Sequence, residues 1–344
     1  MKSKRILYLD MLKIISCIAV VMIHVTADGF NYMNIHSISW NITTIINILV
    51  RFAVPVFVMV SGALFLSPDK QLDVKKLWKK NILNLVIVYI VWTLIYAVYA
   101  VYNRGQGISI INVLGSAVKK SYYHLWFIPM LIGIYACIPL LKPIVNSGKK
   151  TVEYFLIIFA LFYIIPSTIE LFKFPYYTYV RAILNRIQIP MLGYMCYFVL
   201  GHYLHTYELN KKQKRIIYIS SVVAVIISIV VTIVYSWNMN KAILTLANNF
   251  SVTTFIMSIA AFVLMKSLFE NKKMKFEKAI IHLSNISLGI YLIHVLIKDI
   301  LKNQLDMPFT NIWNLPINTV IMLVGSYLIS FGLSKIPFVN KYII

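Results

Sequence analysis

The chain has 344 residues, of which 60% are hydrophobic and 13% charged, and its mean hydropathy is +0.78. A soluble protein of this length needs far more polar surface, so the composition excludes a soluble globular protein and indicates a polytopic membrane protein. The formal net charge is +22. The basic residues lie in short loops between apolar segments, which is typical of membrane topology. No basic run is interleaved with aromatic residues as nucleic-acid binding requires, so no nucleic-acid partner is expected.

Ten apolar segments follow one another along the chain, each about as long as the 17–25 residues that a spanning helix needs. They are 6–27, 43–66, 82–102, 123–141, 152–170, 187–205, 216–236, 247–269, 279–301 and 314–334. No polar stretch between them is long enough for a separate soluble domain. We therefore predict a single all-α membrane domain over residues 1–344, a bundle of about ten transmembrane helices.

The loops between these segments alternate in charge. One set, which includes both chain ends, carries 22 Lys and Arg residues, and the other set carries 8. Because Lys and Arg gather in cytoplasmic loops, this asymmetry predicts that both termini lie in the cytoplasm.

The first segment carries three groups that are costly inside a bilayer, Asp10, Lys13 and His24. A charge at membrane depth costs about 2.5–3.5 kcal/mol on insertion scales, so such groups usually face a bundle interior or a watery cavity. Lys13 and His24 are close to three whole helical turns apart, which places them on one stripe of the helix, about 16 Å from each other. Asp10 lies one turn before Lys13, where it is expected to serve as the counter-ion of that lysine.

Arg51 lies in the second segment, in the run RFAVPVFVMVSGALF. Arginine stays charged, so it needs an anionic partner or water. The predicted topology places Arg51 and His24 in the same outer half of the membrane, and we expect them to line one chamber. Ser61 and Gly62 follow in the same run. We interpret them as small residues that let helices approach closely, in preference to a ligand contact.

A polar stripe also runs along the ninth segment, SLGIYLIHVLIKDIL, where Ser287, Tyr291, His294 and Lys298 share one helical face. Such a face should point into the bundle. His294 is then either a hydrogen-bonded core histidine or part of a substrate site, and the sequence favours neither.

His124 and Trp126 open the fourth segment, in YYHLWFIP, at the predicted outer surface. They either contact an extracytoplasmic substrate or anchor the membrane interface. We predict that His124, Trp126, Tyr291 and His294 bind substrate. The cysteines Cys17, Cys137 and Cys196 lie inside apolar segments and form no metal motif, so no metal site is expected.

Five stretches together resemble the acyltransferase 3 family of integral membrane acyltransferases. They are YLDMLKIISCIAVVMIH, with ten residues between its Lys and His, RFAVPVFVMVSGALF, HLWFIPMLIGIYACIPLLKPI, YFVLGHYL and SLGIYLIHVLI. They run from residue 8 to about residue 297, so the likeness covers the whole domain. Among family members, the length and the HLWF and SLGIY-x-x-H stretches look most like the enterobacterial common antigen O-acetyltransferases.

The resemblance implies an enzyme of the bacterial cytoplasmic membrane. Such enzymes take an acyl group, usually acetyl from cytoplasmic acetyl-CoA, and place it on a hydroxyl of a cell-surface or lipid-linked polysaccharide. By the same resemblance His24 matches the essential histidine of the family, Lys13 its basic partner and Arg51 the arginine of the second helix. The expected partners are the lipid bilayer, acyl-CoA and the glycan acceptor.

Acyl transfer to a hydroxyl needs a base for the attacking group and a positive charge for the oxyanion. Histidine suits the first role because its imidazole titrates near neutral pH. We therefore expect His24 to act as the general base or as a transient acyl carrier. Arg51 or Lys13 is expected to offset the charge of the thioester oxyanion or of the CoA phosphates, with Asp10 holding Lys13.

The main alternative is a transporter or flippase of a lipid-linked sugar, or a polysaccharide export component, because intramembrane charges fit that class equally well. The sequence shows no inverted repeat, which disfavours it. A second alternative is a membrane anchor or sensor module. Labelled acetyl-CoA separates these classes, since only an enzyme transfers the label to glycan.

Overall fold

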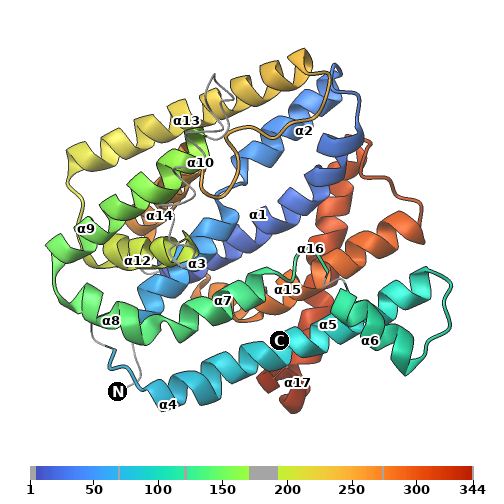
Figure 1. The fold of residues 1–344 in the computed structure, drawn as a ribbon, viewed down its shortest axis with the longest axis horizontal. Coiled ribbons are helices and arrows are strands. Elements are labelled where there is room, and N and C mark those ends of the chain that lie inside the picture. Colours follow the sequence, from blue (N-terminus) through green and yellow to red (C-terminus); the bar gives the residue numbers. More distant parts are fainter. Residues whose placement is uncertain (1–4, 69, 120–121, 170–192, 273–274, 343–344) are drawn as a thin grey trace.

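The computed structural model describes residues 5–68, 70–119, 122–169, 193–272 and 275–342. Over these ranges the chain forms helices and no β-strand (Figure 1). Eight helical stretches are long and apolar enough to cross a membrane, and a bent pair of helices makes a ninth. The predicted all-helical membrane bundle is confirmed.

The helices succeed one another with short connections. In chain order they are α1 (Leu7–Tyr32), α2 (Ile38–Leu49), α3 (Ala53–Phe65), α4 (Val74–Lys76), the π-helical stretch η1 (Leu77–Ile82), α5 (Leu83–Asn103), α6 (Ile110–Lys119), α7 (Phe127–Ala136), α8 (Ile138–Asn146), α9 (Lys149–Phe159), a second π-helical stretch η2 (Ala160–Ile164), α10 (Ile165–Ile169), α12 (Gly193–Thr206), α13 (Lys211–Asn238), α14 (Val252–Phe269), α15 (Glu277–Asn303), α16 (Asn314–Ser334) and α17 (Pro337–Tyr342).

Two of the predicted spans are interrupted. The second is broken between α2 and α3, where residues 50–52 leave the helix, and the fourth bends by 57° between α7 and α8. Pro139 explains the bend, because it has no N–H to continue the hydrogen bonds of α7 into α8 and its ring crowds the preceding turn. The sixth predicted span, 187–205, corresponds to α12, of which the structure describes 14 residues, while residues 187–192 lie outside the described ranges.

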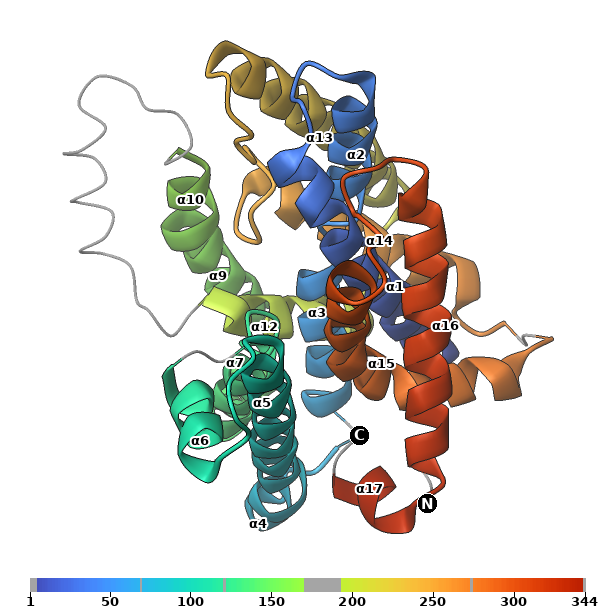
Figure 2. The same cartoon turned by 90° about the vertical axis from the view of Figure 1, so that its right-hand side faces the viewer.

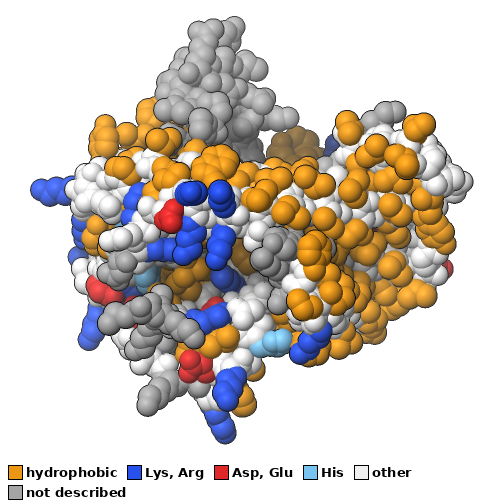
Figure 3. Space-filling view, turned by 90° about the horizontal axis from the view of Figure 1, so that it is seen from below, with side chains coloured by type: hydrophobic (Ala, Val, Ile, Leu, Met, Phe, Trp, Pro, Cys, Tyr) orange, Lys and Arg blue, Asp and Glu red, His pale blue; other side chains and the backbone are white. Residues whose placement is uncertain are grey.

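The connections alternate between the two ends of the bundle. Figure 1 shows the α3–α4, α8–α9 and α12–α13 connections at the left end, and the α1–α2, α5–α6 and α15–α16 connections at the right end. Most of the Lys and Arg side chains visible in Figure 3 gather at that left end, and hydrophobic side chains cover most of the remaining surface. This separation of charge follows the loop pattern of the sequence. The placement of the basic end in the cytoplasm stays a prediction.

Helix α1 lies at the centre of the bundle. It packs against five other helices, α2, α3, α14, α15 and α16. In Figure 2, α5 and α6 lie on one side of α3 and α1, and α16 lies on the other. Because α1 is central, most of its side chains face other helices and not lipid. A spanning helix in this position can carry ionisable side chains.

Helices α3 and α12 cross in direct backbone contact. A Cβ atom added to Gly62 would lie 1.7 Å from the Phe198 carbonyl oxygen, and one added to Gly201 would lie 1.8 Å from that of Met59. No side chain fits at either position, so glycine is required at both. The interpretation of Gly62 as a close-packing residue is confirmed.

Two buried lysines cap the ends of these crossing helices. The Lys142 ammonium donates to the carbonyls of Leu66 and Ser67, at 3.2 and 2.6 Å, just after α3 ends. The Lys266 ammonium donates to the carbonyls of Leu204 and His205 in the last turn of α12, at 3.1 and 2.9 Å. A cation at a helix C-terminus satisfies carbonyls that have no partner within the helix and complements the helix dipole. These contacts fix α3, which carries part of the site, against the bundle.

Replacement of Gly62 by alanine should destabilise the protein. The new methyl group must push α12 away, and such overpacking costs about 1–3 kcal/mol. We expect a clear fall in the melting temperature of the detergent-purified protein. Gly133→Ala is the matched control, because a Cβ there meets nothing within 4 Å. Equal melting temperatures for both variants would contradict the close contact.

Candidate active site

Helices α1 and α15 lie side by side and run in the same direction. Their contacts advance together along both helices, from Asp10 with Ser284, through Cys17 with Ser287 and His24 with His294, to Asp28 with Lys298. The alternating topology predicts this parallel arrangement for the first and ninth segments. The polar stripe of α15 is buried, as its spacing predicts, since Ser287, Tyr291, His294 and Lys298 are each no more than 7% exposed.

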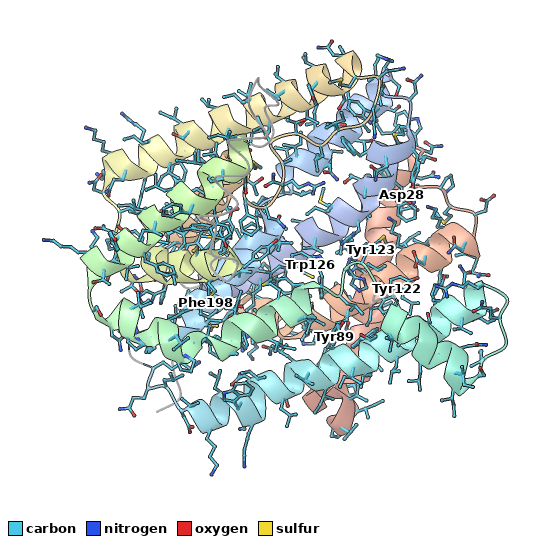
Figure 4. All side chains as sticks on the ribbon, viewed as in Figure 1. Asp28, Tyr89, Tyr122, Tyr123, Trp126 and Phe198 are labelled. Carbon is cyan, nitrogen blue, oxygen red and sulfur yellow. The ribbon has the colours of Figure 1, made fainter. Side chains whose placement is uncertain are left out.

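Three histidines from separate segments meet where α1 passes α15. The ring centroids of His24 and His294 are 5.0 Å apart, and those of His294 and His124 are 5.5 Å apart. The ring of Tyr123 lies 5.3 Å from that of His24. Figure 4 shows the segment that carries Tyr123 and Trp126 in the middle of the bundle, beside α1 and α15. Because His124 is only 1% exposed, it does not anchor the lipid interface.

The geometry of His294 fixes its neutral tautomer. Its Nδ1 lies 2.6 Å from the Tyr291 carbonyl oxygen, which only accepts hydrogen bonds, so Nδ1 carries the proton. The other ring nitrogen, Nε2, is buried and has no hydrogen-bond partner in the described part of the chain. Neutral His294 therefore presents an unused lone pair inside the histidine cluster.

His24 lies between two cavities of different character. The first has a volume of about 30 Å³ and is lined mainly by apolar and aromatic side chains, from Val20, His24, Val54, Phe57, His124, Trp126, Phe127 and Tyr291. The second has a volume of about 270 Å³ and is lined by His24, Ala27, Asp28, Tyr123, Lys298, Asp299 and Lys302. One imidazole thus separates a narrow apolar space from a wider charged space. The structure brings the predicted residues His124, Trp126, Tyr291 and His294 together around it.

The wider cavity, which we call the charged cavity, is lined by equal numbers of acidic and basic side chains. The Asp28 carboxylate forms ion pairs with Lys298 at 3.0 Å and with Lys302 at 2.9 Å. The hydroxyl of Tyr122 donates to Asp299 at 2.5 Å. Two carboxylates therefore face two ammonium groups, and the cavity has many donors and acceptors without a large excess of either charge.

Arg51 lies in the break between α2 and α3 and is tied to α1 through side chains. Its guanidinium donates to the Asn47 amide oxygen, with Nε at 2.9 Å and Nη2 closer, and the Asn47 amide donates to Thr26 of α1 at 2.7 Å. Within the described ranges Arg51 has no carboxylate partner. Arg51 is near enough to act electrostatically on His24, but it lines neither of the two cavities that His24 lines, so a chamber shared by these two residues stays a prediction.

Asp10 and Lys13 lie at the other end of α1. The unbroken helix from Leu7 to Tyr32 keeps Lys13 and His24 three turns apart. The Asp10 carboxylate accepts from the Arg5 guanidinium at 2.8 and 3.1 Å and from the Ser284 hydroxyl at 2.5 Å. Arg5 rather than Lys13 thus makes the direct ion pair with Asp10, because its forked guanidinium matches both carboxylate oxygens. Lys13 is half-buried and lines neither cavity.

The charged cavity contains residues that the sequence did not single out as site residues, namely Asp28, Asp299 and Lys302. The sequence does contain a pattern that indicates one of these charged positions, Asp28. Asp28 follows His24 by four residues and Lys298 follows His294 by four, so each charge lies one turn beyond a histidine on the same face. The pairing of the two motifs depends on the contact between α1 and α15, which neither helix reveals alone.

Comparison with known proteins identifies the family of the chain. Residues 6–335 match the Acyl_transf_3 model, described as an acyltransferase domain. The chain belongs to the acyltransferase 3 family. No curated protein and no solved structure matches.

Membership of this family makes the chain a membrane acyltransferase. The histidine cluster and the two cavities are therefore the candidate active site of an acyltransferase. In the residues that the structure describes, no group of three or more His, Cys, Asp or Glu side chains is arranged to hold a metal ion.

Replacement of Asp28 by asparagine should destabilise this acyltransferase, because Lys298, which is 5% exposed, would keep its charge but lose its direct ion pair. Breaking a buried ion pair from one side costs about 3 kcal/mol or more. We expect a lower melting temperature, partly restored in the double variant Asp28→Asn, Lys298→Met. Asp306→Asn, at an exposed carboxylate, is the control. A melting temperature unchanged in Asp28→Asn would remove the ion pair from the stability of the site.

Proposed function

We propose that this acyltransferase moves an acetyl group from cytoplasmic acetyl-CoA to a hydroxyl of a cell-surface or lipid-linked polysaccharide in the bacterial cytoplasmic membrane. Both termini would lie in the cytoplasm. One observation carries the proposal, the position of His24 between a narrow apolar cavity and a wide charged cavity. An acyl group and a sugar hydroxyl need two such environments on either side of one base.

His24 is proposed as the general base. It takes the proton of the acceptor hydroxyl, whose oxygen attacks the thioester carbonyl carbon. The C–O bond forms, the C–S bond breaks, and the proton passes to the sulfur, so that CoA leaves as the free thiol. Neutral His294 supports this role, because its unused Nε2 lone pair lies in the same cluster and can accept a hydrogen bond from the incoming hydroxyl or from His24.

Arg51 and Lys13 are proposed to meet the negative charges of the donor. A fixed cation near the developing oxyanion lowers the barrier most effectively in a site that excludes water. Arg51 suits this task, since it lies near His24 without a carboxylate to neutralise it. Lys13 lies three turns nearer the basic end of the bundle, which supports a role toward the CoA phosphates.

The charged cavity is proposed as the acceptor site. Its balanced carboxylates and ammonium groups supply acceptors and donors for sugar hydroxyls, and Tyr123 adds an aromatic face. Such a site suits a largely neutral sugar better than a strongly anionic one, because no net positive charge is free.

The His24→Ala variant should fold but lose acetyl transfer. Removal of a general base costs about 10²–10⁴-fold in rate. The measurement is transfer of radiolabel from acetyl-CoA to glycan in membranes of the source cells, with melting temperature as the check on folding. His36→Ala is the control, since His36 is an exposed histidine of the α1–α2 loop that lines neither cavity. Full activity of His24→Ala would remove His24 from the chemistry, and absence of transfer by the wild-type protein would favour the flippase alternative.

The Lys13→Ala variant should bind acetyl-CoA more weakly, by about tenfold, which corresponds to about 1.4 kcal/mol. The loss of one charge–phosphate contact accounts for an effect of this size. Calorimetric titration of the purified protein with acetyl-CoA measures it. Lys241→Ala, at an exposed lysine of the α13–α14 loop, should bind as the wild type does. Equal affinity in Lys13→Ala would argue against a donor-binding role.

A further inference from the structure

The general-base mechanism proposed for His24 gives no role to the walls of the narrow cavity beside it. Val20 precedes His24 by one turn of α1 and is 4% exposed. Val54 and Phe57 come from the first turns of α3, which begins at Ala53. Aromatic side chains from the α7 region and from α15 line another side of this partly open cavity. The volume that they leave, about 30 Å³, holds only a few non-hydrogen atoms.

These walls are held in place by their neighbours. The ring of Phe57 packs on Phe127 with centroids 6.1 Å apart, and Phe127 packs on Tyr291 at 5.6 Å. The Tyr291 hydroxyl donates to the His124 carbonyl, which ties α15 to the segment before α7. Helix α3 is itself fixed by its glycine contact with α12. A longer group placed against these walls would disturb this packing, since well-packed interiors do not yield freely.

We infer that the narrow cavity receives the acyl chain, and that Val20, Val54 and Phe57 limit that chain to two carbons. The inference rests on the proposed function and extends it, because it assigns the choice of acyl donor to particular side chains. The carbonyl carbon would lie beside His24, with the methyl group of acetyl between the valines and Phe57. Each added methylene would meet these walls.

The size of the expected discrimination follows from the size of a methylene. A pocket that fits one hydrocarbon group typically rejects a group longer by one methylene by about 10–200-fold. Acetyl-CoA should therefore be used at least about tenfold better than propionyl-CoA, and butyryl-CoA should be used least. The lipid-facing surface imposes no limit on the length of an acyl chain. A preference for the shorter acyl-CoA would therefore report on the cavity.

The test compares labelled acetyl-, propionyl- and butyryl-CoA as donors to glycan in membranes of the source cells. Phe57→Ala and, separately, Val20→Ala should raise the ratio of propionyl to acetyl transfer by about tenfold or more, because each enlarges the cavity. Phe65→Ala is the matched control. Phe65 lies two turns further along α3, where it packs on Tyr135 at 4.5 Å and does not line the cavity.

The outcomes are distinct. Unchanged donor ratios in both wall variants, with acetyl transfer retained, would overturn the inference and leave the proposed function intact. Equal use of all three donors by the wild-type protein would also overturn it. Absence of transfer from any acyl-CoA by the wild type would instead refute the proposed function.

If Phe57→Ala does not fold, as judged by its melting temperature, Val20→Ala and Val54→Ala decide the matter. Loss of all acyl transfer in folded Val20→Ala and Val54→Ala would count against a role confined to chain length.

Discussion

The parallel contact between α1 and α15 is the interaction on which the candidate active site depends. It joins residues that are about 270 positions apart in the chain, with ion pairs or hydrogen bonds near both ends and the histidines between them. The Arg5–Asp10–Ser284 contacts and the Asp28–Lys298 pair fix how far one helix lies along the other. Buried ion pairs add little net stability but penalise wrong arrangements. A shift of one residue would rotate a side chain by about 100° and separate the two imidazoles.

A second constraint comes from α3, which follows Arg51 and supplies one wall of the narrow cavity. The break before Ala53 frees α3 from the direction of α2, and Pro55 in its first turn suits a helix start. The glycine contacts with α12 then set the depth at which α3 lies. Because α1 touches both α3 and α15, the walls of the cavity and the histidine cluster share one rigid support.

The sequence predicted much of this arrangement, and the limits of that prediction are physical. Hydropathy located the spans, and helical spacing correctly placed the polar face of α15 in the interior, because both depend on local periodicity. The break at Arg51 and the bend at Cys137 arise from proline and from tertiary packing, which window averages cannot detect. The charged cavity escaped prediction for the same reason. Asp28 and Lys302 lie near segment ends, where a charge is ordinary, and only the contact between two distant helices turns them into one site.

Two polar groups of the candidate site, His294 Nε2 and the Arg51 guanidinium, have few or no hydrogen-bond partners among the described residues. A buried acceptor without a hydrogen bond costs about 1–3 kcal/mol, and a cation without a counter-ion costs more. His294 Nε2 is in the first state, and Arg51 has only a neutral amide as its acceptor among the described contacts. His294 lies beside His24, and Arg51 is near enough to act on His24 electrostatically, while Lys298 and Lys302 of the charged cavity are paired with Asp28. A hydroxyl donating to the imidazole cluster and an oxyanion facing the guanidinium would satisfy these groups together. In the proposed reaction a complex with both donor and acceptor would therefore satisfy more polar groups than a complex with either alone.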